Sequence, residues 1–364
     1  MATAADGPGE QVGGVRSIPW RTVTLIALSA VISAVVVVGS YRTLTLPEGQ
    51  AYSGEAWRQF VILGVAQGAI YALIALGYSL VYGILRMINF AHGEIFMVGS
   101  FGAYFFADAY ARSGFLDRHP FPALAIVLLA AMLVSMTIAV LLERIAYRPL
   151  RNAPRLVPLI TAIGASLFLQ NSARGFFGSS PKGFPVPAPL EGNWSLLGIE
   201  ITRVQWVVFL VAAIGVASLS VFVSRTTTGK AMRAVAEDNE IASLMGIRVD
   251  RIVTATFALG GILAGIAGVL YSMTFGQVNF VMGFRPGIAA FTAAVLGGIG
   301  SIAGAALGGV VLGLLQAVGP ALVLTGFGIP SPFQLKDAFT FLVLVLVLIF
   351  RPCGLLGSAA AEKL

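Results

Sequence analysis

Long apolar runs without charged residues, separated by short polar segments, occupy most of the chain. Most of these runs are long enough for a helix, which rises 1.5 Å per residue, to cross a bilayer core of about 30 Å. They predict an all-α, polytopic bundle of about ten transmembrane helices. The expected spans are 22–41, 59–85, one that begins within 83–105, 120–142, 156–173, 204–223, 252–275, two within 286–335, and 338–350.

The ends of the chain and its arginine-rich loops predict the orientation. Residues 1–20 are mostly small, polar and rich in glycine, so we expect a disordered cytoplasmic tail. An extra, uncleaved N-terminal transmembrane helix is expected over 21–41. The segment 143–155 carries four arginines and one glutamate. The positive-inside rule therefore places it in the cytoplasm, together with the charged segment 225–251.

The segment 225–251 is the one long, densely charged stretch between two apolar runs. Its apolar residues recur at i, i+3 and i+4 before Asp238, and again in Ile241, Leu244 and Met245 before Gly246. This spacing predicts two short amphipathic helices, with Asp238 or Asn239 capping the second and Gly246 ending it. Their apolar stripes either bind a partner or pack on the membrane ends of the same chain.

A polar cluster stands at the start of the third expected span. Arg86, Asn89, His92 and Glu94 occur there within nine residues. Polar groups at membrane depth are unfavourable unless paired or hydrated, so Asn89, His92 and Glu94 are candidates for a gate or a transport pathway. The alternative is an interfacial helix cap, in which Asn89 caps the helix and the charged groups compensate helix ends.

Small residues recur at four-residue spacing in several spans and predict close contacts between helices. Gly297 and its neighbours predict a break within 286–335, whose first span is then short or partly re-entrant. One small-residue face consists of Gly64, Gly68, Ala72 and Ala75, and the candidate packing glycines are Gly261, Gly265, Gly300, Gly304 and Gly308.

Composition supports the membrane assignment and excludes several kinds of function. Hydrophobic residues make up 57% of the chain, charged residues 11%, and the mean hydropathy is +0.90. The net charge of +7 resides in short loops, with no aromatic-studded basic groove for nucleic acid. Two distant histidines predict no metal site, and the single Cys353 excludes an internal disulfide.

The chain also lacks the motifs of an energy-converting or hydrolytic enzyme. The sequence TTTGKA has neither the upstream glycine nor the following hydroxyl residue of a nucleotide-binding P-loop. MVGSFG is not a nucleophile elbow, so we expect no enzyme activity. Glu94 and Asp108 are the only acids within apolar spans, and both lie near span ends, which disfavours an ion-driven carrier.

Four motifs resemble one family. YALIALGYSLVYGILRMINFAHGEIFMVGSF, ERIAYRPLR, AVAEDNEIASLMGI and FTAAVLGGIGSIAGAALGG are similar to the H-type permease subunits of bacterial branched-chain amino-acid ABC importers. The resemblance runs from about residue 57 to 357 and implies a permease domain of the type found in ribose and cobalamin importers. The run 22–41 precedes the point at which such permeases usually begin.

The resemblance also implies partners and roles. We expect a second permease subunit, two ATP-binding subunits and an extracytoplasmic substrate-binding protein, in the bacterial plasma (inner) membrane. This chain would bind no cofactor, since ATP and magnesium belong to the ATPases. The segment AEDNEIASLMGI matches the family's ATPase-docking segment. Branched-chain amino acids are the expected substrates, and urea, short amides or ion-driven transport remain alternatives. The positions carried over for coupling are Glu237, Asp238, Ala242 and Gly246.

Overall fold

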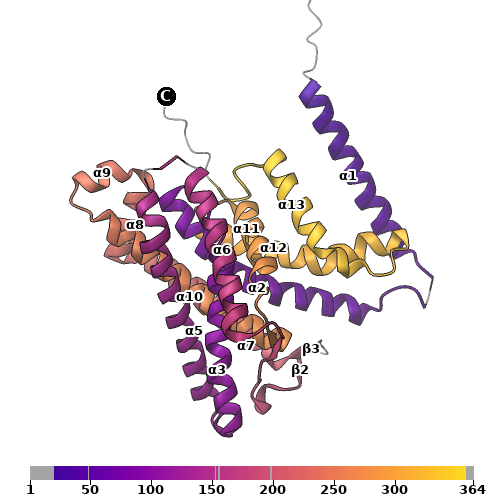
Figure 1. The fold of residues 1–364 in the computed structure, drawn as a ribbon. Helices are drawn as coiled ribbons and strands as arrows, with labels where there is room; N and C mark the ends of the chain where they lie inside the picture. Colours follow the sequence, from indigo (N-terminus) through magenta and orange to yellow (C-terminus); the bar gives the residue numbers. More distant parts are fainter. Residues whose placement is uncertain (1–19, 48, 152, 155, 197–198, 358–364) are drawn as a thin grey trace, which may run out of the picture. The chain divides into compact units, whose positions relative to one another are not determined.

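The structure is a computed structural model that describes residues 20–47, 49–151, 153–154, 156–196 and 199–357. These residues are mostly helical, with two small two-stranded sheets (Figure 1). The chain forms two compact units, which we describe separately. The smaller unit contains the described part of residues 1–51 with 322–329, and the larger contains 52–321 with the described part of 330–364.

The smaller unit pairs the first helix with a short 3₁₀ turn. Helix α1, Trp20–Leu44, matches the predicted extra helix, and the 3₁₀ turn η5 is Thr325–Phe327. A Cβ on Gly326 would collide with the Gly39 carbonyl oxygen, so the backbones of α1 and η5 meet closely at these two glycines. Apart from Trp20, the tail predicted over 1–20 lies outside the described residues.

The larger unit contains all the other elements. Its two sheets are antiparallel and short: β1 pairs with β4, and β2 pairs with β3 as a hairpin. The strands are β1 Lys182–Gly183, β2 Asn193–Leu196, β3 Ile199–Thr202 and β4 Gln277–Val278. The helices are α2 Gly54–Leu85, α3 His92–Arg112, α4 Phe115–Arg118, α5 Pro120–Leu142, η1 Glu143–Tyr147, η2 Arg148–Leu150, α6 Leu156–Phe177, η3 Ala188–Leu190, α7 Arg203–Arg225, α8 Thr227–Glu237, α9 Asn239–Leu244, α10 Val249–Phe275, α11 Phe284–Gly297, α12 Ile302–Gly319, η6 Pro332–Leu335 and α13 Lys336–Phe350; the π-turn η4, Pro320–Leu324, runs from this unit into the smaller one.

Each predicted span corresponds to a helix. Among the described residues, eight helices are long and apolar enough to cross a membrane, judged by length and composition. They are α1, α2, α5, α6, α7, α10, α12 and α13 with their continuations. The two remaining predicted spans correspond to α3, which carries several charged residues, and to the short α11. The chain is therefore a polytopic helical membrane protein.

Helix α2 forms the centre of the larger unit. Its second half is almost wholly buried, because α10, α11, α12 and α7 pack around it. Close backbone approach makes this possible. A Cβ on Gly309 would collide with Ala72, and one on Gly313 would collide with Gly64 and Gly68. The predicted small-residue face of α2 thus lies against a glycine face of α12.

Glycines also lie where α10 crosses α5 and where α12 crosses α11. A Cβ on Gly261 would lie 2.8 Å from Ala139 Cβ, and one on Gly265 would approach the Ala131 carbonyl oxygen at 2.5 Å. Gly304 and Gly308 face the backbone of α11 in the same way. Helices with side chains at these positions could not approach so closely.

Gly300 was predicted to be a packing glycine, and this prediction is wrong. It lies in the turn between α11 and α12, with φ +93°, and a Cβ there would have nothing within 4 Å. Its N–H donates to Ser79 Oγ at 2.9 Å. The four-residue spacing was misleading because α12 starts only at Ile302, so Gly300 serves the chain reversal and not a helix contact.

A chain of buried polar side chains joins α2, α12 and α13, and the sequence pattern did not reveal it. Tyr71 Oη donates to Gln316 Oε1 at 2.8 Å, and Gln67 Nε2 donates to the same oxygen at 3.3 Å. Gln316 in turn donates to Thr340 on α13. Such hydrogen bonds hold membrane helices together where apolar contacts alone do not discriminate between neighbours.

Replacing Gly313 by Ala should lower the thermal stability of the detergent-solubilised protein. The added methyl group would collide with backbone atoms of α2, and overpacking of this kind costs roughly 1–3 kcal/mol. The matched control is Gly164→Ala in α6, where nothing lies within 4 Å of the added atom. Equal unfolding temperatures for the two variants would show that α2 and α12 do not meet at this glycine.

Candidate functional site

The segment between α7 and α10 folds as two short helices, as its pattern predicted. Helix α8 starts after Thr226, whose side chain accepts from the Gly229 N–H at 3.0 Å. Helix α9 starts after Asp238, whose Oδ1 accepts from the N–H groups of Glu240 and Ile241, both at 3.0 Å. Asp238 is thus the cap of the second helix, one of the two candidates from the sequence.

Helix α8 is fixed to the end of the helical bundle by its inner stripe. Met232 and Val235 are buried, and they form a small cluster with Ala242 of α9 and Ile252 of α10. Gly229 permits this docking, because a Cβ there would collide with the end of α7. For α8, the interpretation that the stripe packs on its own chain is correct.

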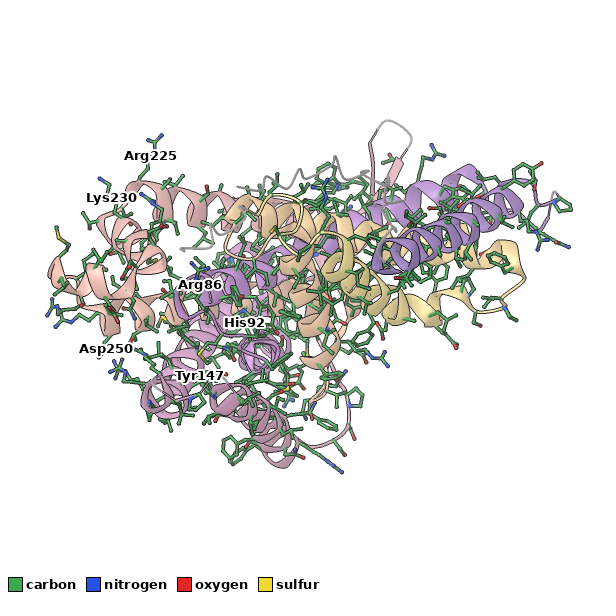
Figure 2. All side chains as sticks on the ribbon, turned by 90° about the horizontal axis from the view of Figure 1, so that it is seen from above. Arg86, His92, Tyr147, Arg225, Lys230 and Asp250 are labelled. Atoms are coloured by element: carbon green, nitrogen blue, oxygen red, sulfur yellow. The ribbon has the colours of Figure 1, made fainter. Side chains whose placement is uncertain are left out.

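Two arginines add polar anchors to α8. Arg86 has φ +52° at the end of α2, and its Nη2 donates to the Ala236 carbonyl at 3.1 Å. Arg233 of α8 donates to the Val223 carbonyl at the end of α7. Figure 2 shows that Arg225 and Lys230 lie at the outer edge of this region while His92 lies inside the bundle. Helix α8 is therefore held from both α2 and α7.

Helix α9 presents its apolar residues outward. Leu244 is 85% exposed, Met245 78% and Ile241 58%. Gly246 has φ +83°, and the Ile247 and Gly246 N–H groups donate to the carbonyls of Ala242 and Ser243. These two bonds form a Schellman motif, which fixes the end of the helix. The result is a rigid, exposed apolar tip on an anchored base.

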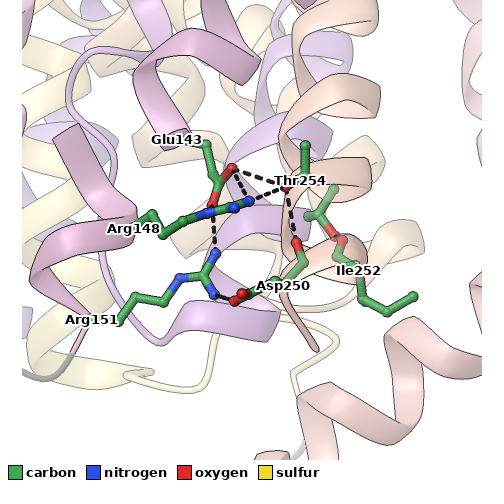
Figure 3. A network of polar contacts seen from close by, with 7 residues as sticks. Glu143, Arg148, Arg151, Asp250, Ile252 and Thr254 are labelled. Atoms are coloured by element: carbon green, nitrogen blue, oxygen red, sulfur yellow. Dashed lines mark hydrogen bonds and ion pairs between the residues drawn. The ribbon is translucent and has the colours of Figure 1, made fainter. Parts of the chain in front are cut away.

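An ion-pair network holds the neighbouring chain segment to the same end of α10 (Figure 3). The Glu143 side chain is fully buried and accepts from Arg148 at 3.1 and 3.2 Å and from Arg151 at 2.5 Å. Thr254 of α10 donates to the same carboxylate at 2.9 Å, and Asp250 pairs with Arg151. A buried charge with several partners of this kind fixes η1 and η2 against α10.

The three polar residues proposed as a gate do not meet in one place. Asn89 is buried, and its Oδ1 accepts from Tyr147 Oη at 2.6 Å and from the Ala91 N–H at 3.0 Å. It caps the turn before α3 rather than the helix itself, whose cap residue is Ala91. Tyr147 thus holds Asn89 from the ERIAYRPLR segment. The sequence pattern gave no sign of this pair.

His92 and Glu94 point to different surroundings. The His92 ring packs edge-on against Tyr78, with centroids 4.8 Å apart, and fills the space that Gly77 leaves in α2. Glu94 instead lines a cavity of about 510 Å³ bounded by α2, α3, α6 and α11. Its Oε1 accepts from Ser166 Oγ at 3.4 Å, while Oε2 is buried and has no hydrogen-bond partner.

Comparison with known proteins assigns the chain to a family. The family model for the permease component of branched-chain amino acid transport systems matches residues 60–348. The chain belongs to this family.

Individual relatives give the same result. The permease is 44% identical over 308 residues to the high-affinity branched-chain amino acid transport permease BraD of Pseudomonas aeruginosa, covering 84% of this chain and 97% of the relative. It is 41% identical over 305 residues to LivH of Escherichia coli, covering 82% and 95%. A probable LivH of Methanocaldococcus jannaschii is 27% identical over 314 residues, covering 80% and 92%.

The four positions predicted to serve coupling differ in exposure. Glu237 at the end of α8 is exposed, and Asp238 caps α9. Ala242 is buried against the membrane domain, and Gly246 ends α9. Of these four, only Glu237 offers a freely accessible side chain. Ile241, Leu244 and Met245, which formed the predicted stripe, are the residues that α9 exposes.

We expect Arg151→Met to destabilise the permease through the buried Glu143 carboxylate. Losing a charge-assisted hydrogen bond to a buried charge costs about 1.5–3 kcal/mol. The control is Arg112→Met, which removes the exposed Arg112–Asp108 pair on α3 and should cost at most about 0.5 kcal/mol. Chemical unfolding in detergent measures both. Equal losses would show that the network has no more effect than a surface pair.

Proposed function

We propose that this permease carries branched-chain amino acids across the bacterial plasma membrane as one permease subunit of an ATP-binding-cassette importer. Relatives of 44% and 41% identity, matched over nearly their whole length, are named as high-affinity permeases for these substrates. A second permease subunit, two ATP-binding subunits and an extracytoplasmic binding protein would complete the importer. ATP and magnesium would bind to the ATPases.

The observation that carries this proposal is the exposed apolar tip of α9 on its anchored base. Exposed Leu244 and Met245 are unfavourable in water, so a partner that covers them gains apolar contact. Helix α8, the base of this tip, is fixed by Met232, Val235 and Arg86. A displacement of α9 by a partner would therefore be transmitted to the membrane helices without first deforming the segment between α7 and α10. This arrangement fits an ATPase that drives the permease by docking at α9.

Transport by the reconstituted importer tests the function directly. Proteoliposomes that contain the permease, its partner permease and its ATPases should take up radiolabelled leucine, isoleucine and valine when ATP and loaded binding protein are supplied. Urea and short amides, offered in the same way, should not enter. Uptake that persists without ATP but disappears when the proton gradient collapses would contradict the proposal and indicate an ion-driven carrier.

Leu244→Glu should abolish association with the ATPase while the permease stays folded. A carboxylate placed in an apolar contact must lose its water, and no counter-charge is expected there. Trp194→Glu on the β2–β3 hairpin is the control, since it places the same charge on another exposed apolar residue, near the other end of α7. Co-purification of the ATPase measures association. Normal recovery with Leu244→Glu would rule out docking at α9.

Gly246→Val should uncouple ATP hydrolysis from uptake without loss of the folded permease. The left-handed backbone at Gly246 disfavours a branched side chain by about 1–2 kcal/mol, and relaxing it would re-aim α9. Gly328→Val is the control, because Gly328 also has positive φ and open space around it. Uptake and ATPase stimulation by binding protein should fall only in the first variant. Equal behaviour of both variants would refute a coupling role.

A further inference from the structure

The cavity beside Glu94 has the composition of a site for a small apolar molecule that carries a cationic group. Its walls are largely apolar, and its volume of about 510 Å³ lies within the usual range of small-molecule sites. The apolar walls come from three helices and from the segment before α3. The lining includes Tyr78 of α2, Phe90 before α3, Ile163 and Leu167 of α6, and Ile288 and Phe291 of α11. Leu167 and Phe284 are exposed, so the cavity opens between α6 and α11.

Glu94 is the single charged residue in this lining. The residue is only 2% exposed, yet Oε2 has no hydrogen-bond donor and Oε1 has only the long contact with Ser166. A buried carboxylate normally has several partners, as Glu143 does in the network of Figure 3. The contrast between the two residues indicates that the missing partner of the Glu94 carboxylate is a group that enters the cavity.

The N-termini of two helices partly stabilise the Glu94 carboxylate. Glu94 lies in the first turn of α3, and its Oε2 is adjacent to Gly283, the residue before α11. Each helix N-terminus contributes roughly half a positive charge, spread over its free N–H groups. They offer partial charge but no hydrogen bond to Oε2, so a cation remains favoured.

We propose that this cavity is a transit site for the substrate, in which Glu94 binds the ammonium group of an apolar amino acid. The substrate's side chain would lie against the apolar walls on α6 and α11, and its carboxylate would remain at the open side. The proposal rests on the proposed function and adds a residue that selects for amino acids over uncharged apolar or amide solutes. One unpaired carboxylate suits passage, because a solute held by a single polar contact can also leave.

Uptake by the reconstituted importer separates this role from a structural one. Glu94→Gln keeps the shape but removes the charge, so leucine uptake should fall at least about tenfold at saturating binding protein. Asp108→Asn is the matched control on the same helix, and it should leave uptake unchanged. Stimulation of ATP hydrolysis by binding protein should persist in both variants. Unchanged uptake with Glu94→Gln would overturn the proposal.

Photolabelling locates the site independently. Photo-leucine, a diazirine analogue of leucine, should label peptides 163–170 and 284–291 in the working importer and in Asp108→Asn, but not in Glu94→Gln. Equal labelling of Glu94→Gln, or labelling only elsewhere, would refute the site. A wild-type importer that takes up no amino acid would instead refute the proposed function. If Glu94→Gln fails to assemble, Leu167→Trp, which fills the cavity mouth, should block labelling and uptake, and normal labelling would refute the proposal.

Discussion

Close approach of helix backbones is the constraint on which the larger unit depends. Helix α2 is surrounded by other helices, and glycines on α12 face the small residues Gly64, Gly68 and Ala72 of α2. In a membrane, apolar side chains gain little from meeting each other rather than lipid, so short distances between backbones supply much of the attraction. Glycine is therefore used here for proximity as well as for turns.

The close packing around α2 positions two other features, the exposed tip of α9 and the cavity beside Glu94. At one end, the Glu143 network and the α8 anchors fix the segments that carry the exposed tip of α9. Within the unit, the same packing places Glu94 beside a cavity with no full counter-charge. A compensated carboxylate holds the structure together, and an uncompensated one is available to a ligand. Glu143 and Glu94 are similarly buried, and they differ in the number of polar partners that their carboxylates have.

Much of this fold could be predicted from the sequence because membrane helices are recognised by their length and apolarity. The spans, the break near Gly298, the Asp238 cap and the left-handed Gly246 follow from local rules. Contacts between distant segments do not. No local sequence pattern indicates that Asn89 pairs with Tyr147 or Gln316 with Thr340. Gly300 has the four-residue spacing of a packing glycine, but it precedes the first residue of α12.

The candidate site was predictable in part for the same reason. The polar cluster around Glu94 was visible in the sequence. The structure does not group Glu94 with Asn89 and His92, because these three side chains, although close in sequence, point into three different environments. On α8 and α9, one amphipathic pattern produced a buried stripe and an exposed one. Periodicity shows that a face exists, whereas tertiary packing decides what covers it.

A cryo-electron microscopy structure of the complete importer, with both permeases and both ATPases, would show directly whether an ATPase docks at α9. We expect Leu244 and Met245, at the end of α9, to lie buried in a surface groove of an ATPase, while Met232 and Val235 keep their contacts with the membrane helices. An ATPase bound elsewhere on the permease, with the α9 tip still exposed to water, would contradict this expectation.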